Sequence, residues 1–144
     1  MAITFIGSEI FVSVETPDAE TAAGYSALAW TSIGRVISAG EIGDTSEDVN
    51  YDILKTGRKR HVNGIADIGE IPITVEFEQT DAGQVVVQDA SGTNDTHSFY
   101  AEDEDGEIQY FQGVVANYRA SERTASTYKG AMFSIRGQSA ITTS

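Results

Sequence analysis

The chain has 144 residues, with nine Lys and Arg against 22 Asp and Glu, a formal net charge of −13 and an isoelectric point near 4.3. This length fits one folded domain, and the strong negative charge argues against a surface that binds nucleic-acid phosphates. The 40% content of hydrophobic residues is that of a chain that folds. The absence of cysteine excludes a disulfide framework, a thiolate nucleophile and a Cys-ligated zinc site.

The N-terminal residues 1–6 contain no basic segment and no long apolar run. They therefore predict neither a secretory signal nor a membrane span, and we expect synthesis in the cytoplasm.

The sequence is predicted to be mainly β, because β-branched and aromatic residues gather in short runs bounded by Gly, Asp, Asn or Ser. In the clearest run Ile71, Ile73, Val75 and Phe77 alternate with other residues, as in a strand with one buried face. The predicted strands are 10–15, 31–38, 71–78, 96–102, 107–116 and 128–136. We interpret them as one domain over residues 1–144, an antiparallel β-sandwich or partial barrel, with Trp30 packed in the core at a strand end.

Residues 44–69 have few apolar positions and are predicted to form a long loop or an extended hairpin. A segment of this length in a compact domain is normally functional or disordered. It holds the basic residues Lys55, Arg58, Lys59 and Arg60. Such a run is most often a solvated loop and could contact phosphate. The net charge of the chain instead favours an acidic protein patch, on another copy of this chain, as its partner.

One short helix is predicted over residues 81–90, with Thr80 as its cap and Asp81 at its positive end. Ala82, Val85 and Val86 have helical spacing, so their side of the helix is expected to cover the sheet.

The Asp-Gly pair at residues 105–106 predicts a tight turn between two antiparallel strands. Residues 138–144 have the composition of a flexible tail that orders only against a partner.

The sequence has no motif for a catalytic, metal or cofactor-binding site. His61 and His97 lack the spacing of paired metal ligands. The acidic run at residues 102–107 lacks the ligand spacing of an EF-hand, so a solvated turn is favoured over a Ca²⁺ site. We expect no cofactor and no enzymatic activity.

Charge is unevenly distributed along the chain. Residues 61–118 contain no Lys or Arg but twelve Asp and Glu. The basic residues gather in the 44–69 segment and near the C-terminal end.

Two motifs, in this order, carry a resemblance to a known family. The first is Trp-Thr-Ser-Ile-Gly-Arg-Val at residues 30–36, followed by Gly-Glu at 40–41. The second is the Asp-Gly turn followed by Tyr-Phe-Gln-Gly-Val-Val at residues 110–115. With the polar segment between them, the chain resembles the major tail tube proteins of long-tailed, lambda-like siphophages over roughly residues 10–137.

This resemblance implies a virion protein whose copies form hexameric rings that stack into a hollow tail tube. The long loop would reach a neighbouring subunit or ring, and Thr74, Glu76 and Glu78 would face the lumen. The implied partners are the chain itself and the tape measure, tail terminator and tail tip proteins. DNA would pass through an acidic lumen without specific binding, and no membrane is involved.

Two alternatives remain open at this point. A ring-forming tube of a secretion or contractile injection system shares the implied architecture. A monomeric β-sandwich binding module, for instance for carbohydrate, would require an exposed aromatic platform and a stable monomer.

Overall fold

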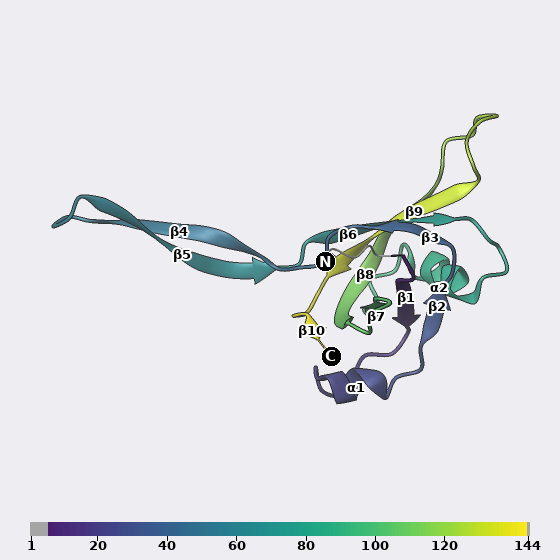
Figure 1. Cartoon of the computed structure of the whole chain (residues 1–144), viewed down its shortest axis with the longest axis horizontal. Helices are drawn as coiled ribbons and strands as arrows, with labels where there is room; N and C mark the ends of the chain where they lie inside the picture. Colours follow the sequence, from purple (N-terminus) through teal and green to yellow (C-terminus); the bar gives the residue numbers. More distant parts are fainter. Residues whose placement is uncertain (1–5, 144) are drawn as a thin grey trace.

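The structure is a computed structural model that describes residues 6–143, and within this range it is mainly antiparallel β (Figure 1). The strands of the main sheet are β1 (Glu9–Ser13), β2 (Thr31–Ile33), β3 (Val36–Ala39), β6 (Glu70–Glu76), β7 (His97–Glu102), β8 (Ile108–Ala120), β9 (Gly130–Gly137) and β10 (Thr142–Thr143). Their spatial order is β2-β1-β7-β8-β9-β6-β3, and β10 pairs with β8 beside this path. The prediction of a mainly β, antiparallel fold is confirmed.

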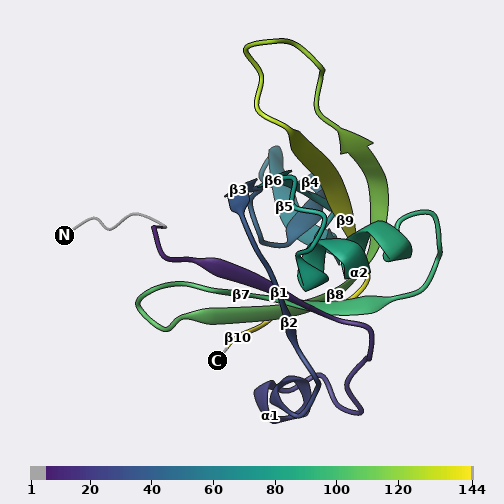
Figure 2. The ribbon, with the colours of Figure 1, turned by 90° about the vertical axis from the view of Figure 1, so that its right-hand side faces the viewer.

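Strand β8 joins the two halves of the sheet, because it pairs with β7 at its start and with β9 at its end. It curves from the direction of β1 and β7 into that of β9 (Figure 2). Gly113 lies at the junction, opposite both His97 and Gly137. A Cβ there would lie 2.8 Å from the carbonyl oxygen of Arg136, so the approach of the two strands requires glycine. A bulge farther along β8 places Asn117 in the left-handed region, with φ 59°.

The hydrophobic core lies between this curved sheet and the helix α2 (Ala82–Ala90). Ile71, Ile73 and Val75 are buried, which confirms the alternation predicted for β6. The other large core residues are Ile10, Val12, Ile33, Ile68, Val87, Phe99, Phe111, Val115, Phe133 and Ile135. Burying one such side chain contributes about 1.5–3 kcal/mol relative to leaving it exposed.

The cap of α2 is Asp81 and not Thr80. One carboxylate oxygen of Asp81 accepts hydrogen bonds from the backbone N–H groups of Gln84 and Gly34, at 3.0 and 3.1 Å. The same side chain therefore caps the helix and fixes the end of β2.

The predicted buried face of α2 is wrong for Ala82 and Val85, whereas Val86 is partly buried and packs against the core as predicted. The residues of α2 that are buried are Gly83, Gln84, Val87 and Ala90. Val85 is 42% exposed and Ala82 is also exposed. The helix is turned this way because Gly83 packs against the backbone of β2, where an added Cβ would lie 2.6 Å from Cα of Ile33. Apolar periodicity gives no weight to glycine and cannot detect such an approach.

The predicted strand 31–38 is two strands that lie at opposite edges of the sheet. β2 pairs with β1, and β3 pairs with β6. The chain turns between them at Arg35, whose φ of 59° is uncommon for a residue other than glycine. Gly34 and Arg35 occupy this turn, but the apolar residues Ile33 and Val36 on either side of them match the pattern of one continuous strand.

Two further segments differ from the prediction. A second helix, α1 (Ala22–Ser26), begins after Thr21, whose hydroxyl accepts a hydrogen bond from the backbone of Gly24. Residues 138–143, expected to order only against a partner, already lie along β8 in the single chain. Gln138 donates its backbone N–H to the carbonyl of Gln112, and β10 pairs with residues 109–110.

Candidate functional site

The segment 44–69 forms a hairpin that projects from the sheet, made of β4 (Thr45–Ile53) and β5 (Arg58–Asp67) (Figure 1). Every residue of the two strands except Ile53 is exposed. Gly57 closes the turn in the left-handed region, with φ 65°, and donates its N–H to the carbonyl of Ile53 at 2.8 Å. Of the two predicted forms, the extended hairpin is the one observed.

The hairpin has two different faces, because residues directly opposite each other on antiparallel strands project to the same side. On one face the opposed pairs are Val49 with Val62, Tyr51 with Arg60, and Ile53 with Arg58. On the other they are Asp48 with Asn63, Asn50 with His61, and Asp52 with Lys59. We call these the arginine face and the carboxylate face.

The four basic residues of this segment therefore do not form one cluster. Lys55 lies in the turn, Arg58 and Arg60 lie on the arginine face, and Lys59 lies on the carboxylate face. The structure brings Arg58 and Arg60 together with exposed apolar side chains, a combination that a count of charges along the sequence does not reveal.

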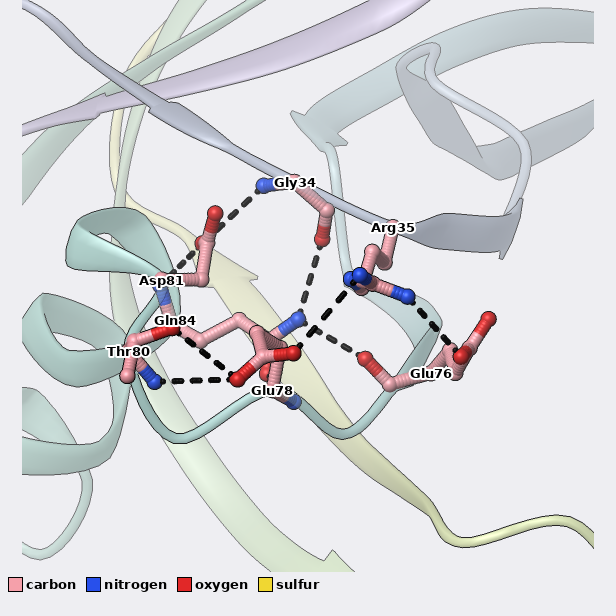
Figure 3. A network of polar contacts seen from close by, with 7 residues as sticks. All are labelled: Gly34, Arg35, Glu76, Glu78, Thr80, Asp81 and Gln84. Atoms are coloured by element: carbon pink, nitrogen blue, oxygen red, sulfur yellow. Dashed lines mark hydrogen bonds and ion pairs between the residues drawn. The ribbon is translucent and has the colours of Figure 1, made fainter.

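The residues expected to face a lumen, Thr74, Glu76 and Glu78, lie on or just beyond β6, on the side away from the core. Arginine side chains lie beside the two glutamates. Arg35 contacts the carboxylate of Glu76 at 3.0 Å and that of Glu78 at 3.6 Å (Figure 3). At the start of β6, Arg136 contacts the carboxylate of Glu70 at 2.9 Å. This side of the sheet is therefore largely charge-compensated.

Hydrogen bonds and one cation hold Glu78 in its ionised form. The side-chain hydroxyl and backbone N–H of Thr80 donate to its carboxylate at 3.0 and 3.3 Å (Figure 3). These two bonds, with a smaller contribution from Arg35, lower the pKa of Glu78 below its ordinary value of 4.5.

An acidic groove of about 670 Å³ opens between β1, β3 and the turn that joins β7 to β8. Its acidic lining residues are Glu9, Glu41, Asp103 and Glu107. Its apolar lining includes Ile10, Ile37 and Ile42, and Ile37 on the edge strand β3 is 54% exposed. No Lys or Arg is among the described residues that line it.

The acidic turn at one side of this groove follows the Asp-Gly prediction. Gly106 has φ 91° and donates its backbone N–H to Asp103 at 2.8 Å. Carboxylate oxygens of Asp103, Asp105 and Glu107 lie within 4.8 Å of one another. Asp103 accepts from the hydroxyl of Ser8 and Asp105 from the backbone of Glu107, so hydrogen bonds of the turn account for the placement of these two side chains.

The two histidines differ in their surroundings. His61 is exposed on the carboxylate face, with Nδ1 2.9 Å from the carboxylate of Asp48. His97 is buried, with Nδ1 3.1 Å from the carbonyl oxygen of Asp95. Within residues 6–143, no helix is long and apolar enough to cross a lipid bilayer.

An aromatic cluster that sequence analysis missed lies on the side of the sheet away from the main core. Phe11 and Tyr110 each contact Tyr100, Trp30 meets Tyr100 edge-on at 4.7 Å, and Tyr25 of α1 stacks on Tyr110 at 5.0 Å. Trp30 packs here and not in the main core as predicted. The sequence contained a signal for this cluster. Period-2 alternation places Phe11, Tyr100 and Tyr110 on the opposite side of their strands from the core residues next to them.

The cluster does not form an open aromatic platform. Tyr25 and Tyr110 are buried and the other three rings are half-buried. Among the described aromatic residues, the exposed ones are Tyr51 on the β4–β5 hairpin and Tyr128 between β8 and β9.

No family model and no curated protein matches this chain by sequence. Solved structures match its fold. A chain from the PVC sheath/tube terminator of an extracellular contractile injection system, in the extended state, has a TM-score of 0.68 at 7% identity, covering 100% of this chain and 97% of that one. A chain from the tail of an empty GTA particle, refined with C6 symmetry, has a TM-score of 0.62 at 12% identity, covering 92% of both.

A chain from the six-fold symmetrised baseplate of the anti-feeding prophage also has a TM-score of 0.62, at 9% identity, covering 100% of this chain and 95% of that one. At these identities the likeness is one of fold. The chain shares its fold with components of phage-tail-like particles.

Proposed function

We propose that this protein is a structural subunit of a phage-tail-like tube, and that its copies form hexameric rings that stack. The observation that carries the proposal is the exposed β4–β5 hairpin on a fold shared with tail components. Six-fold symmetry in two of the similar structures supports rings of six.

The hairpin needs a neighbour to be stable. A two-stranded hairpin is marginal in water by itself, and this one exposes Leu54 at 99%, with Val49, Tyr51, Val62 and Ile65 also exposed. Nine residues of β4 span about 30 Å. The hairpin is therefore long enough to bring Lys55, Arg58, Lys59 and Arg60 to another subunit or ring.

The edges of the sheet provide a second surface for assembly. β2 and β3 are the terminal strands of the sheet and leave unpaired backbone groups. A ring that closes uses each edge as an interface and so removes the aggregation hazard of an open edge.

The side of β6 that carries Thr74, Glu76 and Glu78 is the candidate lumen wall. Its cations Arg35 and Arg136 are held by glutamates, which limits their attraction for phosphate. Such a wall supports passage of DNA without retention, because each retained phosphate contact would slow sliding. The tape measure, terminator and tip proteins are the further partners of such a tube.

A second candidate is the terminator ring at the end of a tube, and the fold likeness to a chain from a sheath/tube terminator favours it. A tube of a contractile injection system is the third arrangement compatible with the fold. The siphophage major tail tube identity stays a prediction beside these.

Electron microscopy of the concentrated protein tests the proposal. A tube subunit should form stacked rings of extended length, whereas a terminator should form single rings. Neighbouring genes would separate the two kinds of tail, since an adjacent sheath gene indicates a contractile particle. Persistent monomers in every condition, together with absence from isolated particles, would overturn the structural function.

A further inference from the structure

The arginine face of the hairpin has the chemistry of a docking surface. It presents Val49, Tyr51 and Val62, each about half exposed, beside the guanidinium groups of Arg58 and Arg60. Neither Arg58 nor Arg60 forms an ion pair with another described residue. Arginine next to aromatic and aliphatic area is a combination enriched at protein interfaces.

The acidic groove is complementary to this face. Glu9, Glu41, Asp103 and Glu107 supply negative charge at its rim, and Ile37 and Ile42 supply apolar surface. The opposite face of the hairpin carries Asp48 and Asp52 against the single cation Lys59, so the same groove would attract it less than the face with Arg58 and Arg60. Charge therefore favours the arginine face of the hairpin as the side that meets this groove.

The groove cannot receive the hairpin of its own chain. Glu41, at the rim, lies only four residues before β4 begins at Thr45. From that base the hairpin projects away from the sheet (Figure 1). A rigid two-stranded arm of about 30 Å would need to fold back at its base to reach the groove. A hairpin that fills this groove would therefore come from another copy.

We infer that the arginine face of the β4–β5 hairpin of one copy docks in the acidic groove of a second copy. This inference rests on the proposed assembly and names the surface that receives the hairpin. Because the two surfaces differ, the contact is head-to-tail, and such contacts close into rings or continue as filaments.

A charge exchange tests the pairing. We expect Arg58→Glu with Arg60→Glu to lower the assembled fraction about tenfold, measured by sedimentation at physiological salt. Glu41→Arg with Glu107→Arg, at two exposed groove positions, should have the same effect. Mixing the two double variants should restore assembly, because each supplies a surface that the other can bind. Asn50→Glu, at an exposed position of the carboxylate face, is the matched control and should assemble normally.

Crosslinking gives a second readout, and the cysteine-free sequence provides a clean background. Copies with Tyr51→Cys are mixed with copies carrying Ile37→Cys and treated with a short bis-maleimide under assembly conditions. Heterodimers should form, whereas Asn50→Cys, from the carboxylate face, should give none with Ile37→Cys. Circular dichroism and thermal melts confirm that each variant is folded.

The outcomes separate this inference from the proposed function. If the wild-type chain forms rings or tubes while neither crosslinking nor charge-exchange rescue occurs, the docking is overturned and the structural function stands. If the wild-type chain never assembles and the Tyr51→Cys and Ile37→Cys copies never crosslink, both are overturned.

Discussion

The side-chain amide of Gln84 donates a hydrogen bond to the backbone carbonyl of Gly34, with 3.0 Å between Nε2 and the oxygen (Figure 3). The same nitrogen donates to the carbonyl of Glu76, and the amide oxygen accepts from the backbone of Glu78. Gln84 is 3% exposed. One buried amide thus ties α2 to the end of β2 and to the end of β6, next to the proposed lumen wall.

Replacing this amide should be costly. In Gln84→Leu three backbone groups lose their partner in a buried place, so we expect a loss of about 1–3 kcal/mol in the free energy of unfolding. Chemical denaturation measures it. Gln88→Leu, one turn later on the exposed side of α2, is the control and should change stability by less than about 0.5 kcal/mol. Equal effects at the two positions would contradict the bridging role.

Replacing Gly83 should lower the stability of the protein by a similar amount. Gly83→Ala places a Cβ 2.6 Å from Cα of Ile33, and neither backbone can move without disturbing the sheet. We expect a loss of about 1–3 kcal/mol from this overpacking. Gly43→Ala is the matched change, since a Cβ there meets nothing within 4 Å. A thermal melt of both variants that gave the same midpoint would refute the close approach.

The hydroxyl of Tyr118 is buried and has no hydrogen-bond partner among the described residues. Burial raises the pKa of this phenol above its ordinary value of 10.0. Tyr118→Phe removes an unsatisfied polar atom, so we expect stability to be unchanged or to increase by up to about 1 kcal/mol. Tyr25→Phe should instead destabilise the protein, because the hydroxyl of Tyr25 accepts from Gln112 at 3.3 Å. Urea denaturation of Tyr118→Phe and Tyr25→Phe measures the change in the free energy of unfolding for each. A loss of stability in Tyr118→Phe would contradict the prediction.

The pKa of Glu78 gives a prediction for acid stability. Its folded pKa is below the unfolded one, so its contribution is complete above about pH 4.5 and is lost as pH falls through the folded value. Thr80→Val removes the largest cause of this shift. We expect the pKa of Glu78, followed by carboxyl NMR, to rise towards 4.5. Thr80→Ser keeps the hydroxyl and should leave the pKa low; a low value in Thr80→Val would assign the shift to another group.

Several features were predictable from local sequence because short-range rules determine them. The alternation in β6 follows from the period of two in a strand, and the turn at Gly106 follows from an Asp-Gly pair. The hairpin over residues 44–69 was one of two forms compatible with its composition. The existence of α2 was also predictable, but its cap and its buried face were not, because these depend on what Asp81 and Gly83 contact.

The sequence alone determined that the chain is mainly β and antiparallel, acidic, and equipped with a long polar segment that carries basic residues. Only the tertiary structure decided where charges meet. Arg35 and Glu76 are 41 residues apart and Arg136 and Glu70 are 66 apart, yet each pair is in contact. Arginines from outside the acidic segment therefore compensate its glutamates on β6, whereas Asp103 and Glu107 of the same segment line a groove without Lys or Arg. Likewise, strand register separates Lys59 from Arg58 and Arg60. The reason is physical: periodicity and turn chemistry act over a few neighbouring residues, whereas strand register and sheet order bring together residues that are distant along the chain.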